Sequence, residues 1–378
     1  MGKLVNFDNA ATTFPKPVSV KNAAVLAITQ YGGNPGRSGH SLSIQTAKAV
    51  YDSRLACADF FGAEAENVVF TLNCTHALNL AIKGIMADGG HIITSNLEHN
   101  SVARPIYALS KQRCIYDVAT VSCNDDETVA NFERLIKADT KAIACTIASN
   151  VTGQILPYKK IAQLCKKHGL CFIADGAQGC GILPIKLSDG INIICTAGHK
   201  GLYGTTGTGL LITDGKFHLS TIFEGGTGST SLELEQPDFL PDRLESGTIN
   251  TVGAIALGAG VDFVRKMSIQ RIFSHEEELC KQFINGISLM KGVTVYRNDG
   301  CSYVPIVSFN IDGYLANEVT QILSDKGFGL RGGLHCAALA HQALGTAPDG
   351  TARFAPSVFS TREQVAMLIN VIRQIKSK

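Results

Sequence analysis

Two charged side chains follow apolar runs in the middle of the chain. Asp175 comes directly after the run Cys171–Ala174, and Lys200 lies a few residues after the run Ile191–Cys195. A carboxylate at the end of a buried strand is costly unless it is paired. It either caps a following helix or pairs with a pyridinium nitrogen in a cofactor site. A lysine in a Gly-rich loop is either solvated or partly desolvated, and desolvation lowers its pKa and suits it to form a Schiff base.

A cysteine lies in a second Gly-rich segment near the C-terminus. Cys336 ends the segment Arg331–Cys336, in which Arg331 and His335 are placed to favour a thiolate. The two glycines of this segment predict a mobile loop. Arg353 alternates with apolar residues on an expected strand, where it is either a residue of the rim or a bidentate clamp for a carboxylate.

Three further polar side chains follow expected strands. Thr75 and His76 open a helix after Val68–Leu72, and a helix N-terminus with hydroxyl and amide donors suits a phosphate group, although an ordinary threonine cap has the same sequence. The ring of His99 either stacks on a flat cofactor or belongs to an ordinary loop. The glycines of Gly204–Gly209 are not in the order of a dinucleotide fingerprint, and the chain has no Walker A sequence.

The elements that position these side chains alternate between strands and helices from about residue 68 to residue 215. The expected strands are continuous apolar runs, which indicates a mostly parallel sheet covered by helices on both faces. We expect strands at Val68–Leu72, His91–Ser95, Ala142–Ser149, Cys171–Ala174 and Ile191–Cys195, with helices at Thr75–Met86 and Pro157–His168. Ligands bind outside the carboxyl ends of such strands, which is where the chemical candidates lie.

The pattern changes after about residue 250. A long helical region is expected at Thr251–Ser288, with the acidic run Glu276–Glu278 on a solvated face. The smaller α+β part that follows is expected to contain strands and helices near Val293–Arg297, Val304–Ile311, Leu315–Lys326 and Thr361–Ile375. We therefore expect an N-terminal segment that packs on the small domain, a large domain and a small C-terminal domain, at residues 1–15, 16–255 and 256–378.

The composition argues against several classes of protein. The chain has 378 residues, of which 45% are hydrophobic and 17% charged, so it can bury a sizeable core and is unlike a disordered chain. A net charge of +2 gives no footprint for nucleic acid or an acidic membrane surface, and the start of the chain has no apolar signal core. The 12 cysteines contain no C-x-x-C pair. We expect no metal site, reduced thiols that mostly pack in the core, and a cytoplasmic location.

Together these residues resemble the cysteine desulfurases, enzymes of the class V aminotransferase group that have fold type I and depend on pyridoxal 5'-phosphate. The resemblance covers essentially the whole chain and rests on Asp175–Gln178, Gly198–Lys200, the Cys336 loop, Phe7–Ala11, Arg37–His40, Glu245–Asn250 and Arg353. It implies an α/β fold with a mostly parallel seven-stranded sheet between helices and a smaller α+β C-terminal domain. The Cys336 loop is similar to the branch that includes selenocysteine lyases.

The resemblance implies a role for each candidate side chain. Lys200 binds the cofactor and moves the substrate α-proton, Asp175 pairs with the pyridinium nitrogen, and Cys336 is the nucleophile. The implied contacts of the cofactor are His99 on the ring, Gln178 at the phenolic oxygen, Asn150 beside it, and Thr75, His76 and His199 at the phosphate, with Thr248 from the other subunit of a homodimer. The implied substrate contacts are His40, Asn150, Arg331 and Arg353.

The implied reaction converts L-cysteine to L-alanine and leaves a persulfide on Cys336, which passes to a protein acceptor. Selenocysteine lyase, an aminotransferase or β-lyase on another amino acid, and a cysteine-rich metal or iron–sulfur protein remain open. The sequence departs from the family pattern at Cys74, His76, Ala197 and Thr205. The first three of these departures concern the expected contacts of the phosphate.

Overall fold

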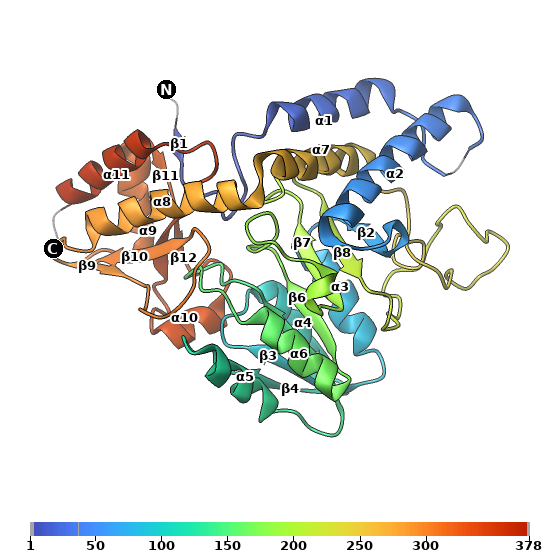
Figure 1. Cartoon of the computed structure of the whole chain (residues 1–378), viewed down its shortest axis with the longest axis horizontal. Helices are drawn as coiled ribbons and strands as arrows, with labels where there is room; N and C mark the ends of the chain where they lie inside the picture. The colour runs from blue at the N-terminus through green and yellow to red at the C-terminus, as the bar shows by residue number, and fades with distance from the viewer. Residues whose placement is uncertain (1–3, 37, 376–378) are drawn as a thin grey trace.

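The larger sheet of the computed structural model has seven strands in the order β2-β8-β7-β6-β5-β3-β4 (Figure 1). Within the described residues, 4–36 and 38–375, β8 is the strand that runs antiparallel to both of its neighbours, and the others are parallel. The prediction of a mostly parallel seven-stranded sheet is confirmed. Arg37, which belongs to one of the motifs named above, lies outside the described residues. The strands are β2 Val68–Thr71, β3 Gly90–Ser95, β4 Cys114–Ala119, β5 Thr140–Thr146, β6 Cys171–Asp175, β7 Ile193–Ala197 and β8 Gly209–Thr213.

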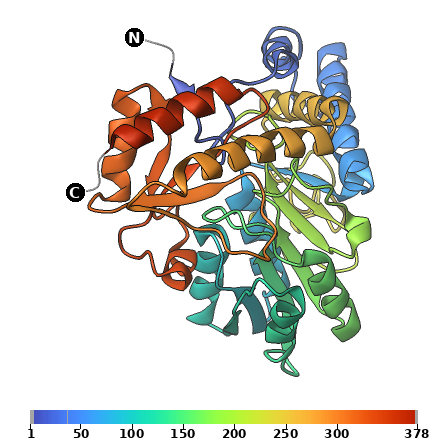
Figure 2. The ribbon, with the colours of Figure 1, turned by 60° about the vertical axis from the view of Figure 1, so that its left-hand side comes forward.

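Helices cover both faces of this sheet (Figures 1 and 2). Successive side chains of a strand point to opposite faces. In β6, Phe172 and Ala174 accordingly pack with residues of α2, α6 and α7, whereas Cys171 and Ile173 pack with residues of α3 and α4. This double burial explains why the strands are continuous apolar runs. The helices of this part are α1 Val18–Gln30, α2 Ser41–Phe61, α3 Cys74–Ile85, α4 Asn100–Ser110, α5 Asp125–Glu133, α6 Tyr158–His168 and α7 Thr251–Met267.

A second, antiparallel sheet has four strands in the order β12-β13-β10-β9, and β1 pairs in parallel with β11. Helices α8 and α11 lie side by side over it (Figure 2). The elements are β1 Val5–Asn6, α8 Ile269–Ile287, β9 Val293–Val295, β10 Val307–Ile311, α9 Ala316–Asp325, β11 Phe328–Gly329, β12 Arg331–Gly333, α10 Ala338–Leu344, β13 Thr351–Phe354 and α11 Arg362–Gln374. The division into domains at 1–15, 16–255 and 256–378 stays a prediction.

The helical region expected after residue 250 is confirmed, and one expectation about it is wrong. The region divides into α7 and α8 at Ser268, whose φ of 71° lies in the left-handed region that helical residues do not adopt. The acidic run Glu276–Glu278 is not entirely solvated, since Glu276 is 4% exposed and accepts a hydrogen bond from the Tyr203 hydroxyl at 3.2 Å. Burial raises the pKa of Glu276 to about 8, so this carboxyl group keeps its proton near neutral pH.

The expectation that all cysteines are reduced is also wrong. Cys123, after β4, forms a disulfide with Cys301, which lies between β9 and β10. Of the ten free cysteines that the structure describes, nine are buried and Cys336 is exposed. In the described part of the chain, none of the helices has the length and apolar character needed to cross a membrane.

Candidate active site

Asp175 and Lys200 lie at the same edge of the larger sheet. Asp175 ends β6, Lys200 comes three residues after β7, and the two strands are parallel neighbours. Asp175 is 2% exposed, and its Oδ1 accepts hydrogen bonds from the Ala177 amide at 2.9 Å and the Cys74 thiol at 3.4 Å. The segment after Asp175 is a turn and not an α-helix, so the alternative of a helix cap is wrong.

Lys200 is half-buried in the loop between β7 and β8. Burial lowers the pKa of its amine, and Cys74 and Asp175 oppose this shift. The alternative of a solvated loop lysine is therefore wrong. The N-terminal segment supports this loop, because the Thr13 hydroxyl donates to the carbonyl oxygens of His199 and Lys200, and Lys16 Nζ donates to His199 O at 2.9 Å. Fixing the backbone on both sides of the amine restricts where its nitrogen can point.

His99 caps the first turn of α4, where its Nδ1 accepts a hydrogen bond from the Ser101 amide at 3.0 Å. Burial lowers the pKa of His99, with a further contribution from Lys200, Arg331 and Arg353, while Asp175 acts in the opposite direction. The charged groups that act on the pKa of His99 come from distant parts of the chain, so these parts converge on one site.

Two of the expected phosphate residues, Thr75 and His76, lie at the start of α3. Thr75 is exposed in the first turn of this helix, and His76 Nδ1 accepts a hydrogen bond from the Leu72 amide at 3.2 Å. The His76 ring packs edge-on against Phe223 at 5.5 Å between centroids. Nδ1 of His199 is buried and has no hydrogen-bond partner among the described residues. Burial lowers the pKa of His199 to about 4, so its ring is neutral at pH 7.

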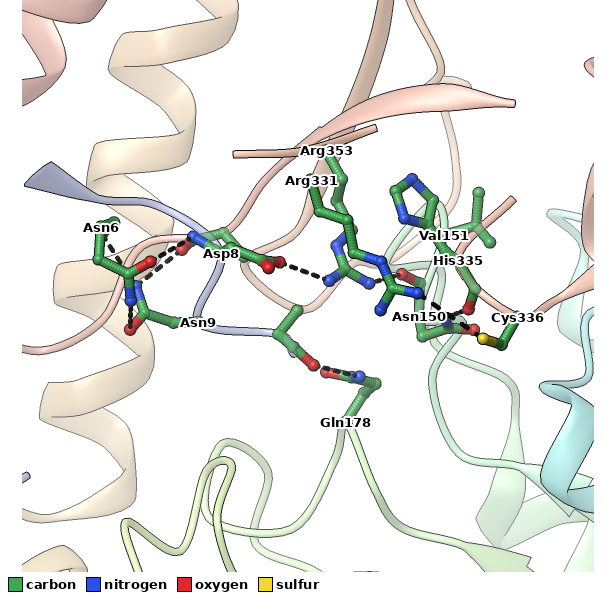
Figure 3. Close-up of polar contacts among 12 residues, drawn as sticks. Asn6, Asp8, Asn9, Asn150, Val151, Gln178, Arg331, His335, Cys336 and Arg353 are labelled. Carbon is green, nitrogen blue, oxygen red and sulfur yellow. Dashed lines mark hydrogen bonds and ion pairs between the residues drawn. The ribbon is translucent and has the colours of Figure 1, made fainter. Parts of the chain in front are cut away.

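Cys336 is exposed in the short connection between β12 and α10, and the Arg331 guanidinium lies beside it (Figure 3). Arg331 Nη2 is 3.6 Å from Cys336 Sγ. The connection is held through its backbone: the Asn100 amide donates to Cys336 O at 2.7 Å, and Asn150 Nδ2 donates to His335 O at 2.8 Å. His335 and Cys336 have φ angles of 49° and 56°, a backbone conformation that costs about 1–3 kcal/mol per non-glycine residue.

One expectation about this loop is corrected by the structure. His335 does not support a thiolate by its charge, because it is 2% exposed and burial lowers its pKa to about 2. Its Nε2 lies 3.0 Å from the carbonyl oxygen of Thr351, so the ring anchors the loop to β13. Gly332 allows close packing, since a Cβ there would lie 2.5 Å from the carbonyl oxygen of Ala316 at the start of α9, and the mobility of the loop stays a prediction.

Arg353 is fully buried in the centre of the small sheet, which excludes the alternative of a rim residue. Its Nη2 pairs with Asp8 Oδ1 at 2.8 Å, and its Nη1 donates to Asn150 O at 2.9 Å (Figure 3). Nε of Arg353 and Oδ1 of Asn150 are buried without a partner among the described residues. Buried polar atoms normally have partners, so these two atoms are open to a polar ligand.

Three candidates remain, and one of them, Gln178, lies near Lys200. Gln178 donates to Ala10 O at 3.0 Å and lines a cavity together with Lys200. His40 caps α2 and Thr248 accepts a hydrogen bond from Asn34 at 3.3 Å. Thr248 lines one cleft with Arg54 and another with His76, and no interaction within the described chain joins Thr248 or His40 to Lys200. The assignment of both residues to the site stays a prediction, and that of Thr248 depends on a second subunit.

Sequence reasoning missed three residues that support the site. Asp8 is the partner of Arg353, and Lys16 holds the backbone beside Lys200. Glu98 is buried and both of its carboxylate oxygens lie 3.0 Å from the Thr146 amide, which ties the end of β3 to the end of β5. Burial raises the pKa of Glu98 to about 8. Asp8 belongs to the segment Phe7–Ala11 and Glu98 precedes His99, so the sequence draws attention to both. No motif marks Lys16.

The fold and this edge of the sheet define a large class of cofactor-dependent enzymes, and the comparisons with known proteins give the family. The sequence profile of the Aminotransferase class-V family matches residues 5–368. The chain belongs to this family, whose members use pyridoxal phosphate.

Three similar proteins are described as cysteine desulfurases, and each matches this chain over most of its own length. A probable cysteine desulfurase of Methanothermobacter thermautotrophicus is 29% identical over 97% of this chain and 94% of its own. A cysteine desulfurase of Haloferax volcanii is 28% identical over 98% of this chain and 88% of its own. The apo structure of a cysteine desulfurase from Thermococcus onnurineus covers 98% of this chain and 94% of its own, with a TM-score of 0.92 and 29% identity.

The side chains present fit pyridoxal phosphate. The site combines a half-buried amine of lowered pKa on Lys200 with the buried carboxylate of Asp175, whose two hydrogen bonds both end on Oδ1. The unpartnered buried nitrogen of His199 is a further polar atom open to a ligand. The amine of Lys200 can bind an aldehyde, the carboxylate of Asp175 a ring nitrogen, and the nitrogen of His199 an anionic group.

Proposed function

We propose that the protein is a pyridoxal phosphate-dependent cysteine desulfurase that converts L-cysteine to L-alanine and collects the sulfur as a persulfide on Cys336. The observation that carries the proposal is Cys336 itself. It is the exposed thiol among the ten free cysteines of the described residues, and the Arg331 guanidinium is 3.6 Å from its sulfur.

We assign the cofactor to Lys200, Asp175, His99 and Gln178, with Thr75, His76 and His199 at its phosphate. Bound there, pyridoxal phosphate supplies an electron sink for the electrons of the substrate Cα–H bond. The hydrogen bonds on Oδ1 of Asp175 leave Oδ2 for the ring nitrogen. In this assignment Thr248 comes from the second subunit of a homodimer.

The protein's own groups then handle the proton, the carboxylate and the sulfur. Burial lowers the pKa of the Lys200 amine, and this amine takes the α-proton of the substrate. Arg353 Nε and Asn150, supported by Asp8, bind the substrate carboxylate. The Cys336 thiolate attacks the substrate sulfur: an S–S bond forms, the C–S bond breaks, and the carbon fragment accepts protons to become alanine. The persulfide then passes to an acceptor thiol on a partner protein.

The test measures alanine, sulfide and the mass of the Cys336 peptide after incubation with L-cysteine. Cys336→Ala is expected to keep the yellow bound cofactor and lose sulfide release and the added sulfur. Lys200→Ala is expected to lose the absorption of the covalently held cofactor. Cys114→Ala is the matched control, because Cys114 is a buried thiol on an edge strand, and it should keep all three signals.

The same experiment separates the alternatives. Full desulfurase activity in Cys336→Ala would refute the assignment of the nucleophile. If the wild type acts on selenocysteine but not on cysteine, and Cys336→Ala keeps that activity, the protein is a selenocysteine lyase, because a selenol leaves without help from the thiolate. Formation of a keto acid in place of alanine identifies an aminotransferase.

A further inference from the structure

A second cysteine touches the site without being exposed. Cys74 is the first residue of α3 and is 7% exposed. Its thiol lies 3.4 Å from Asp175 Oδ1, although the two residues are 101 positions apart in the chain. We infer that Cys74 is a positioning residue whose thiol proton fixes the orientation and charge of the Asp175 carboxylate. The inference rests on the proposed function, because the effect of that carboxylate is exerted on the cofactor.

The direction of this hydrogen bond is determined by the chemistry of the pair. An ionised carboxylate can only accept, so the thiol must donate. Burial raises the pKa of Cys74 well above its ordinary value, and the negative charge of Asp175 acts in the same direction. The thiol therefore keeps its proton over the working range of pH, and the donor is always present.

The second donor decides which carboxylate oxygen faces the ligand. The Ala177 amide also donates to Oδ1, at 2.9 Å. With both donors on Oδ1, this oxygen is held against the start of α3 and the turn after β6, and Oδ2 is the oxygen that remains for a ring nitrogen. A donor on a carboxylate also draws off negative charge, which makes that carboxylate less basic. Cys74 thus weakens the charge that Asp175 presents to the positive groups near it.

Several other groups influence or face Asp175, and the test must hold them constant. The charged and titratable neighbours are Lys200 on the loop after β7, His99 at the start of α4, Glu98 after β3, Cys145 in β5, Cys180 in the turn after β6 and Cys195 in β7. Cys195 is as deeply buried as Cys74, and no hydrogen bond joins its sulfur to the carboxylate in the structure. Cys195→Ala is accordingly the matched control.

The experiment uses the loaded protein without substrate and the same protein stripped of cofactor. Cys74→Ala and Cys74→Val both remove the donor, but valine also replaces the lost volume. In the loaded protein, the pH at which the visible band of the bound cofactor changes is expected to rise by about 0.5–1 unit in both variants, because more negative charge on Asp175 stabilises protonated nitrogens nearby. Cys74→Ser keeps a donor and should fall between wild type and alanine.

The stripped protein gives a second readout that does not need the cofactor. Reductive methylation followed by NMR measures the pKa of the Lys200 amine, which should rise in Cys74→Ala and Cys74→Val and stay unchanged in Cys195→Ala. Equal values in wild type and both Cys74 variants would overturn the inference while leaving the proposed function intact. A wild-type protein that binds no pyridoxal phosphate would instead refute the proposed function.

Discussion

The disulfide between Cys123 and Cys301 should contribute measurably to stability. It closes a loop of 178 residues, and the segment of Cys301 has a further contact nearby, because the Ile155 amide donates to Ser302 O at 2.8 Å. In the chain-entropy account, cross-linking a loop of this length destabilises the unfolded state by about 5 kcal/mol. With an unfolding entropy of about 2 cal/mol/K per residue, the loss of the bond should lower the Tm by about 7 °C.

Two measurements test this prediction. Thiol titration of protein prepared without reductant should find ten thiols in denaturant before reduction and twelve after it. Thermal unfolding followed by circular dichroism should show the drop in Tm on adding reductant, and the same drop in Cys123→Ser, Cys301→Ser and the double variant.

The double variant is also the control, because reductant should not change its Tm. Twelve thiols before reduction would refute the disulfide. An equal effect of reductant on the wild type and the double variant would refute its contribution to stability.

Three further predictions concern charge and backbone strain. The pKa of Glu276 is raised to about 8, so the folded state holds a proton that the unfolded state releases above about pH 4.5, and this group lowers stability as the pH rises towards 8. Glu276→Gln should remove roughly 4 kcal/mol of that decline, measured by urea unfolding from pH 5 to pH 8. An unchanged slope of stability against pH would contradict this prediction. Asp8→Asn leaves the buried guanidinium of Arg353 without its charged partner and should cost about 2 kcal/mol in the same assay, with an unaffected midpoint as the contrary result. Ser268→Gly relieves a φ of 71° between α7 and α8 and should add about 1 kcal/mol, whereas a loss of stability would show that this backbone is not strained.

Much of the larger sheet could be predicted because burial on both faces leaves a direct trace in the sequence. The runs around Cys171–Ala174 and Ile191–Cys195 fall on β6 and β7, although β7 extends to Ala197 and begins two residues later than expected. The closeness of Asp175 and Lys200 also follows from local sequence, since the carboxyl ends of adjacent parallel strands lie at one edge.

The rest depends on contacts between distant parts of the chain. Glu276 stands in a helix whose neighbouring residues, Glu277 and Glu278, are acidic and less buried, and only its packing against Tyr203 reveals its burial. The partners Cys123 and Cys301 are separated by 178 positions, with no spacing that marks them. His335 looks like a charge for Cys336 in sequence, yet the chain turns its ring into the small sheet, towards Thr351.

The balance of charge in the site explains why it suits anionic ligands. Burial lowers the pKa of His99, His199 and His335, so none of these rings adds a positive charge near neutral pH. In the described chain Arg353 has Asp8 as its carboxylate partner, whereas its Nε has no hydrogen-bond partner. A guanidinium nitrogen without a partner can donate to a carboxylate that enters the site, and such charge-assisted hydrogen bonds are stronger than neutral ones. The Arg331 guanidinium lies 3.6 Å from the sulfur of Cys336, so the groups that would bind an amino acid also lie beside the sulfur that would attack it.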